Sequence, residues 1–146
     1  MKQPRPDLDR YFLDIAQVVA KRATCDRAHI GAVLVKDKYI ISTGYNGAPH
    51  GLQHCDEIGH EMENGHCVRT THAEQNAIIQ AAVHGSSTQN ATLYCTHSPC
   101  KICTKLILNA HIIRVVAASF YRDESIPAMF KEAGVEFVLI AEEPLA

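Results

Sequence analysis

The second half of the chain alternates between apolar strand patterns and helical patterns, and this alternation constrains the fold more than any other feature. The apolar runs that read as strands are 91–96, 112–119 and 135–141. A helix is expected over 100–109, and a second begins where Ser125 can act as the cap, with Pro127 in its first turn and Gly134 at its end. Because strand–helix–strand connections form right-handed crossovers, the three strands should lie parallel in one sheet.

The first half of the chain adds a helix and a hairpin. Apolar residues recur at helical spacing from Asp9 to Arg22. The strands Ala32–Val35 and Tyr39–Thr43 follow, joined by a Lys-Asp-Lys turn. We therefore predict an α/β fold with a single domain over residues 1–146: a three-layer α/β/α sandwich around a five-stranded mixed sheet. In such sheets the ligand site lies beyond the carboxyl ends of the strands.

Composition argues against several classes of function. The chain has 146 residues and a net charge of −2, so overall charge does not favour binding to nucleic acid or membrane, and no polynucleotide partner is expected. The N-terminal segment is too polar for a signal peptide, and no apolar run is long enough to span a bilayer. We expect a cytoplasmic protein whose six cysteines are metal ligands or catalytic groups rather than disulfides.

Two short motifs stand at the starts of two expected helices. Cys100 and Cys103 lie three residues apart in a first helical turn, where the helix N-terminus lowers thiol pKa values and favours the metal-binding thiolate. His72, at the start of the neighbouring helix, supplies a third ligand. Three protein ligands leave a tetrahedral zinc ion one open position, which is the catalytic arrangement. A water bound there has its pKa lowered from ~15.7 to roughly 7.

Glu74 follows His72 by two residues and is not needed as a ligand. Its carboxylate can take the proton of the zinc-bound water and pass it to a ring nitrogen and a leaving amine, which contributes ~10²–10⁴-fold in rate. Structural alternatives exist for each piece: Thr71 and Glu74 also match a capping box, and a lone Cys-x-x-Cys can be a redox pair or half of a structural zinc site. The order of the motifs and their helix-start context favour catalysis.

The layout His-x-Glu followed by Pro-Cys-x-x-Cys is the signature of zinc-dependent nucleobase deaminases. The chain resembles the zinc-dependent cytidine deaminase superfamily and, within it, the deoxycytidylate (dCMP) deaminase family. The similarity runs from about Tyr11 to Phe120, and "GYNG" together with "HAE" and "SPCxxC" is more specific than the zinc signature alone. The resemblance implies hydrolytic deamination of dCMP to dUMP, which supplies thymidylate synthesis. It also implies a homohexamer activated by dCTP with Mg²⁺ and inhibited by dTTP.

The same resemblance implies contacts with the nucleotide. Asn46 should hydrogen-bond the sugar, the backbone N–H of Ala73 can meet the base carbonyl, and Ser98 can accept a hydrogen bond from the exocyclic amine. The candidates for phosphate contacts are basic or hydroxyl-bearing residues: Arg27, Tyr121 and, behind them, Arg122. Arg27 could equally be a solvated surface charge.

The stretch Tyr45–Thr70 breaks the regular pattern, and a connection of this length is usually functional or externally braced. Its potential soft ligands are His50, His54, Cys55, His60, His66 and Cys67. Some members of the resembled family hold a second, structural zinc with cysteines that match Cys25 and Cys55. We hypothesise such a closed site here, with four ligands: Cys25, Cys55, His60 and Cys67, with His66 in reserve. The alternative is that these are free thiols and polar loop histidines.

Other functions remain open from the sequence. A deaminase of the same fold could act on a nucleoside, guanine, a pteridine-like precursor or tRNA adenosine, although a tRNA enzyme should carry a basic face. A zinc-stapled interaction module would have no use for Glu74 beside an open metal position. Cys95 reads as a small core residue, and His97 lies where a substrate contact is possible.

Overall fold

The computed structural model describes residues 2–120 and 123–140. Its main sheet has five strands in the order β2-β1-β5-β6-β7. The strands are β1 (Gly31–Lys36), β2 (Tyr39–Tyr45), β5 (Thr92–Cys95), β6 (Arg114–Ala117) and β7 (Glu136–Leu139). Strand β1 is antiparallel to both β2 and β5, and β5, β6 and β7 are parallel. The predicted mixed sheet is confirmed.

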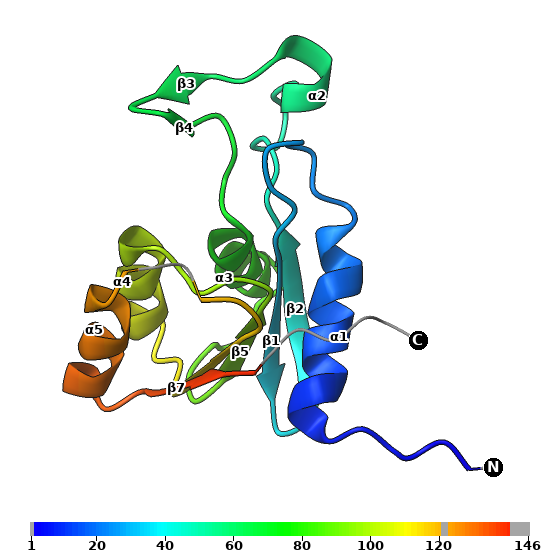
Figure 1. The fold of residues 1–146 in the computed structure, drawn as a ribbon, viewed down its shortest axis with the longest axis vertical. Helices are drawn as coiled ribbons and strands as arrows, with labels where there is room; N and C mark the ends of the chain where they lie inside the picture. The colour runs from blue at the N-terminus through cyan, green and yellow to red at the C-terminus, as the bar shows by residue number, and fades with distance from the viewer. Residues whose placement is uncertain (1, 121–122, 141–146) are drawn as a thin grey trace.

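Helices cover both faces of this sheet (Figure 1). The helix α1 (Leu8–Ala20) lies on one face; the other face carries α3 (Ala73–Val83), α4 (Lys101–Asn109) and α5 (Ser125–Ala133). Alternate strand residues feed two separate cores, so Val33 packs with α1 while Leu34 packs with α3 and its neighbours. The three-layer prediction is confirmed. Among the described residues, no helix is both long and apolar enough to cross a membrane.

Two glycines allow helices to approach the hairpin closely, one on each face of the sheet. A Cβ atom at Gly31 would lie 2.1 Å from the backbone oxygen of Ala16 in α1. A Cβ atom at Gly44 would lie 2.3 Å from the backbone oxygen of Ala73, the first residue of α3. Because both obstacles are backbone atoms, neither position accepts a side chain unless a helix moves.

The start of α5 differs from the prediction. Ser125 is the first helical residue rather than the cap, and Glu124 occupies the N-cap position without a side-chain hydrogen bond. The Asp123 carboxylate instead accepts hydrogen bonds from both the backbone N–H and the hydroxyl of Ser125. An acidic side chain two residues upstream therefore satisfies one of the donors that a helix start leaves open.

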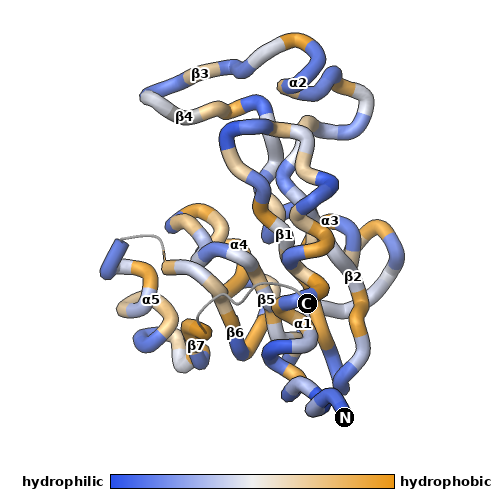
Figure 2. The backbone as a smooth tube through the Cα atoms, turned by 45° about the vertical axis from the view of Figure 1, so that its right-hand side comes forward, coloured by the Kyte–Doolittle hydropathy of each residue, from blue (hydrophilic) through white to orange (hydrophobic). Residues whose placement is uncertain are grey.

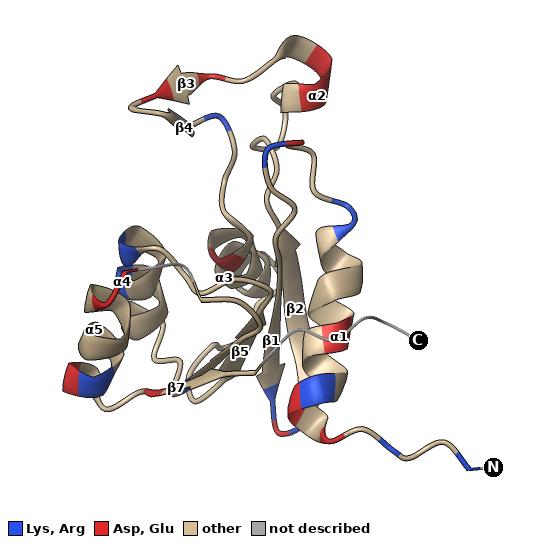
Figure 3. Cartoon of the chain, viewed as in Figure 1, with Lys and Arg blue, Asp and Glu red and all other residues tan. Residues whose placement is uncertain are grey.

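The connection between β2 and α3 projects beyond the end of the sheet, and Figures 1 and 2 show it standing clear of the three layers. It contains the short helix α2 (Cys55–Ile58) and a two-stranded hairpin of β3 (Met62–Glu63) and β4 (His66–Cys67). Figure 3 shows acidic residues on α2 and β3. These elements are too short to produce a readable sequence period, which is why the sequence predicted only a long irregular connection. We call residues 48–70 the projection.

A charged cluster ties α1 to the sheet at the amino end of β6. The two terminal nitrogens of Arg114 donate to the two carboxylate oxygens of Asp9, each at 2.7 Å, and Arg114 Nε donates to Glu136 at 2.9 Å. The Tyr94 hydroxyl also donates to Asp9, at 2.7 Å. The hydrogen bonds from Arg114 hold the pKa of Asp9 below its ordinary value.

We expect Asp9→Asn to lower the free energy of unfolding at pH 7 by about 1–3 kcal/mol, because it breaks a partly buried bidentate ion pair. Since the folded-state pKa of Asp9 is depressed, the pair stabilises the fold above the unfolded-state pKa of ~3.9 and is lost as the pH falls through the folded-state value. Urea unfolding across pH 7 to 3 measures the difference between wild type and variant, which should shrink with acidity. Asp14→Asn, on the same helix, is the control. A difference that does not depend on pH would contradict this account.

Candidate active site and metal centres

The predicted ligands of the catalytic metal lie together where α3 and α4 begin. His72 and Cys100 are the N-cap residues of these helices, each with an extended backbone. The distance from His72 Nδ1 is 3.2 Å to Cys103 Sγ and 3.6 Å to Cys100 Sγ. The three ligand atoms all lie within 4.8 Å of one another. One imidazole nitrogen and two thiols at this spacing fit a tetrahedral zinc ion with one position left over.

The two thiols of this cluster differ in acidity because they share a proton. The hydrogen bond from the Cys103 thiol lowers the pKa of Cys100 to about 4. The backbone N–H of Cys103 also donates to Cys100 Sγ, at 3.4 Å. The hydrogen bond to Cys100 and burial raise the pKa of Cys103. These opposite shifts favour the thiolate form at Cys100, and a divalent metal would displace the proton held by Cys103.

Glu74 is buried beside this cluster, with 4% of its surface exposed. Burial raises the pKa of its carboxyl group above the ordinary value, and a backbone hydrogen bond and the charge of His72 offset only part of this increase. The capping-box alternative for Thr71 and Glu74 is wrong: Gln75 Oε1 accepts the hydrogen bond from the backbone N–H of His72, at 2.9 Å. Gln75, and not Glu74, therefore occupies the capping-box position of α3.

Hydrogen bonds to β2 and its extension fix the start of α3. Asn76 donates from its side-chain amide to the backbone oxygen of Tyr45 at 2.8 Å. The backbones of Gly47 and Thr71 bond to each other in both directions, at 3.2 and 2.8 Å. The two ends of the projection are therefore held together by this backbone pair, directly before His72.

Asn46, the predicted sugar contact, is buried and its amide clasps the segment before β1. Asn46 Oδ1 accepts from the backbone N–H of Ile30 at 2.8 Å, and Nδ2 donates to the backbone oxygen of Ala28 at 2.7 Å. An amide has a second lone pair and a second hydrogen, so these two bonds do not exhaust it. The structure therefore assigns Asn46 a role in shaping the loop, and its sugar contact stays a prediction.

Of the other predicted nucleotide contacts, three lie in the described part of the chain: two near the same helix starts and Arg27 in the segment before β1. Ala73 is the buried first residue of α3, and Ser98 is buried in the turn before α4, where its N–H donates to the backbone oxygen of Ser119 at 2.7 Å. Arg27 is exposed but not merely solvated, because its guanidinium donates to the backbone oxygen of Gly65 at 3.4 Å. Tyr121 and Arg122 lie outside the described residues. The roles of all these residues stay predictions.

A second cluster joins the segment before β1 to the projection. Its four members are those hypothesised from the sequence, with ligand atoms within 4.8 Å of one another: Cys25, Cys55, His60 and Cys67. Cys55 Sγ lies 3.6 Å from Cys67 Sγ, and Cys25 Sγ lies 3.5 Å from His60 Nδ1. Three thiols and an imidazole fit a closed, four-coordinate zinc site. The reserve ligand His66 lies outside the described side chains.

Sequence reasoning missed two side chains that support these clusters. One is Gln75, which caps α3, and the other is Asp26, whose carboxylate lies 2.7 Å from His60 Nε2. Gln75 has a sequence signal, since it lies three residues after the N-cap residue. Asp26 has no signal beyond its place next to Cys25. The assignment of Cys95 to the core is confirmed, since this residue is fully buried between strands and helices.

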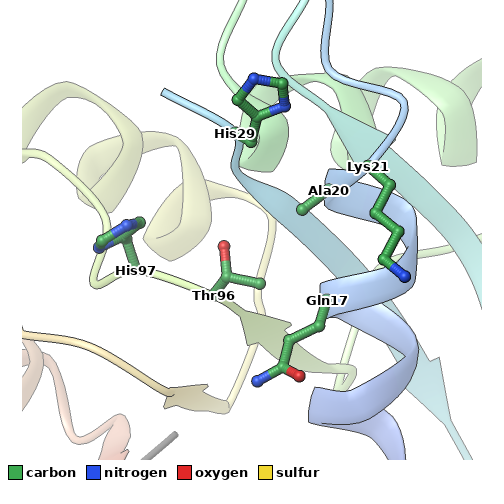
Figure 4. Close-up of a pocket in the computed structure, with 6 residues that line it drawn as sticks. All are labelled: Gln17, Ala20, Lys21, His29, Thr96 and His97. Carbon is green, nitrogen blue, oxygen red and sulfur yellow. The ribbon is translucent and has the colours of Figure 1, made fainter. Parts of the chain in front are cut away.

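A cavity of about 300 Å³ opens between α1 and the ends of β1 and β5 (Figure 4). Its lining residues are Gln17, Ala20, Lys21, His29, Thr96 and His97. The Thr96 hydroxyl accepts a hydrogen bond from the backbone N–H of Gly31 at 3.2 Å, so this side chain serves the strand pairing. The lining includes neither metal cluster, and the substrate contact of His97 stays a prediction.

Comparison with known proteins places the chain in a family. Residues 6–119 match the cytidine and deoxycytidylate deaminase zinc-binding region. The chain belongs to this family, and it is a zinc-binding deaminase domain. The resemblance seen in the sequence is confirmed at this level, and so is the cytidine deaminase-like fold.

Three similar proteins illustrate the relationship. The ComE operon protein 2 of Bacillus subtilis is 41% identical over 87% of this chain and 68% of its own length. The deoxycytidylate deaminase of Saccharomyces cerevisiae is 37% identical over 90% of this chain, which spans only 44% of that protein. The crystal structure of dCMP deaminase from the cyanophage S-TIM5 in complex with dCMP and dUMP has a TM-score of 0.82 at 30% identity. It covers 94% of this chain and 100% of the cyanophage chain.

We expect Gly44→Ala to destabilise the fold by about 1–3 kcal/mol and to weaken metal binding by His72, Cys100 and Cys103, because the new methyl group displaces the start of α3. Urea unfolding and chelator-competition measurements of zinc would show both effects. Gly47→Ala is the control, since its Cβ atom would meet the movable Thr24 hydroxyl at 3.0 Å rather than a helix backbone. Equal losses in the two variants would argue against the close approach of α3 as the cause.

Proposed function

We propose that this chain catalyses the hydrolytic deamination of dCMP to dUMP and ammonia. The observation that carries the proposal is the buried Glu74 carboxyl group beside the His72, Cys100 and Cys103 cluster. Two similar proteins support the substrate, because the yeast relative is a deoxycytidylate deaminase and the cyanophage enzyme was crystallised with dCMP and dUMP. The main alternative is another zinc deaminase that acts on a nucleoside, guanine or tRNA adenosine.

The chemistry divides between the metal and the chain. A zinc ion bound by His72, Cys100 and Cys103 would supply a water that ionises near neutral pH. The Glu74 carboxylate would take one proton from that water and deliver it to the ring nitrogen beside the carbon that carries the amine, as the water oxygen bonds to that carbon. It would then take the second proton from the same oxygen and deliver it to the amine nitrogen, so that the carbon–nitrogen bond breaks, ammonia leaves and the carbonyl of uracil forms. Burial raises the pKa of Glu74 above its ordinary value, which makes its carboxylate a stronger base toward that water.

The remaining parts of the site orient the nucleotide. The Ala73 N–H would donate to the base carbonyl, Ser98 would accept from the exocyclic amine, and Asn46 would bond the sugar. The phosphate would meet Arg27 and Tyr121. The positions of three of these residues support the proposal: Ala73 is the first residue of α3, Ser98 lies in the turn before α4, and Asn46 directly follows β2.

The second cluster is proposed as a structural zinc site. Four protein ligands would close the coordination shell and leave no position for a substrate. A zinc ion at Cys25, Cys55, His60 and Cys67 would join the projection to the segment before β1. The projection needs such a link because its own apolar side chains form no core: Leu52, Ile58 and Met62 are exposed.

Regulation and assembly are proposed from the family resemblance alone. The proposed assembly is a cytoplasmic homohexamer that is activated by dCTP with Mg²⁺ and inhibited by dTTP. Its proposed role is to supply dUMP for thymidylate synthesis.

Zinc-loaded protein should release ammonia from dCMP, and Glu74→Gln should lower the rate by ~10²–10⁴-fold while retaining the metal, since Glu74 is not a ligand. Ammonia release would be measured with dCMP, CMP, deoxycytidine and dCTP, each with and without dCTP–Mg²⁺ or dTTP as effector. Glu132→Gln on the exposed face of α5 is the matched control. Turnover of deoxycytidine equal to that of dCMP would remove the phosphate requirement. No turnover of any cytosine compound would overturn the proposal.

Fully loaded protein should contain two zinc ions for each chain, one for each cluster. Cys55→Ala should reduce the content to one ion and leave the catalytic ion in place. Cys95→Ala is the matched control, because Cys95 is the cysteine that belongs to neither cluster, and it should retain both ions. Elemental analysis of protein passed over a desalting column gives the count. A single ion in the fully loaded wild type would contradict the structural site.

A further inference from the structure

A carboxylate outside both ligand sets holds the histidine of the second cluster. Asp26 Oδ1 lies 2.7 Å from Nε2 of His60. The other ring nitrogen, Nδ1, lies 3.5 Å from Cys25 Sγ and faces the cluster. A carboxylate accepts hydrogen bonds and does not donate them, so His60 Nε2 carries the hydrogen in this contact. In the neutral ring, the Nδ1 lone pair is then directed toward the thiols.

The position of Asp26 in the chain makes this contact specific. Asp26 follows the ligand Cys25 directly, so the backbone that places one ligand also places the carboxylate that orients another. The next residue, Arg27, donates to the backbone oxygen of Gly65 in the turn between β3 and β4. Three consecutive residues therefore contact the projection: Cys25 contacts the second cluster, Asp26 contacts His60, and Arg27 contacts the β3–β4 hairpin.

We propose that Asp26 is a positioning residue of the second metal site. Its carboxylate fixes the ring orientation of His60, so that Nδ1 is presented to a zinc ion shared with Cys25, Cys55 and Cys67. Metal-binding histidines commonly donate their other N–H to a carboxylate, and removal of such a partner costs about 10–100-fold in metal affinity. Asp26 is 77% exposed and water competes for its oxygens, so the lower end of that range applies. The inference rests on the proposed structural zinc site.

Chelator competition tests this role in the zinc-loaded full chain. We expect Asp26→Leu to weaken zinc binding about tenfold at the second site and to leave the catalytic ion unchanged. Asp26→Asn should remain close to wild type, because its side-chain oxygen can still accept the hydrogen bond from His60 Nε2. The matched control is Asp56→Leu: Asp56 follows the ligand Cys55 just as Asp26 follows Cys25, but it is exposed on α2 and is not part of the ion pair with His60.

A spectroscopic readout separates orientation of the ring from a general loss of charge. Imidazole ¹H–¹⁵N correlation spectra of the zinc-bound wild type should show His60 with hydrogen on Nε2 and metal on Nδ1, and Asp26→Leu should lose or broaden this pattern. Equal weakening by Asp26→Leu and Asp56→Leu would overturn the positioning role. Wild-type affinity in Asp26→Leu, with two ions bound, would overturn it while leaving the second site intact. A single ion in loaded wild type would remove the site and this role together.

Discussion

The candidate active site depends on one constraint: the helices α3 and α4 both begin at the same edge of the sheet. His72 and Cys100 are both N-cap residues, so each ligand leaves the backbone at a point where the chain is still extended. Parallel strands deliver their following helices to the same edge of a sheet, and the antiparallel hairpin supplies the surface against which α3 is held. Gly44 permits that contact, and Asn76 fastens it to Tyr45. The metal-binding geometry is therefore a consequence of sheet topology together with one close helix approach.

The sequence predicts this part of the molecule well because each step depends on a strong local pattern. The strand–helix alternation determines the sheet, and the motif positions relative to the helix starts determine which side chains meet. The second cluster has no such local pattern, because three of its members lie in the projection, which has no regular period, and the fourth, Cys25, precedes β1. Composition and family resemblance indicated Cys25, Cys55, His60 and Cys67, and the structure brings these four side chains together.

Local competition between neighbouring polar residues could not be resolved from the sequence. Gln75 rather than Glu74 caps α3, because the helix starts at Ala73 and not one residue earlier. A shift of one residue changes which side chain reaches back to the cap, and sequence patterns do not determine helix ends so finely. Likewise α5 starts at Ser125 itself, so the Asp123 carboxylate, rather than the Ser125 hydroxyl, accepts a hydrogen bond from a backbone N–H of the first turn. Asn46 turns toward the backbone of Ala28 and Ile30, a contact with no sequence period to reveal it.

The two clusters are linked by a short stretch of backbone. The segment that carries Cys25 and Arg27 is bonded to Asn46, and the neighbouring Gly47 pairs with Thr71 immediately before His72. Metal binding in the projection would therefore hold the loop that the nucleotide is proposed to touch. A metal ion at this proposed second site would therefore have a structural role close to the active site and would take no part in the reaction itself.

The most direct test of the account is a crystal structure of zinc-loaded Glu74→Gln with dCMP, with the metal located by anomalous diffraction at the zinc edge. The account predicts an anomalous peak from a zinc ion that is bound by His72, Cys100 and Cys103. The amine-bearing carbon of the base should lie beside the fourth coordination position of that ion. A metal enclosed by four protein ligands at that point, or dCMP bound away from it, would contradict the proposed active site.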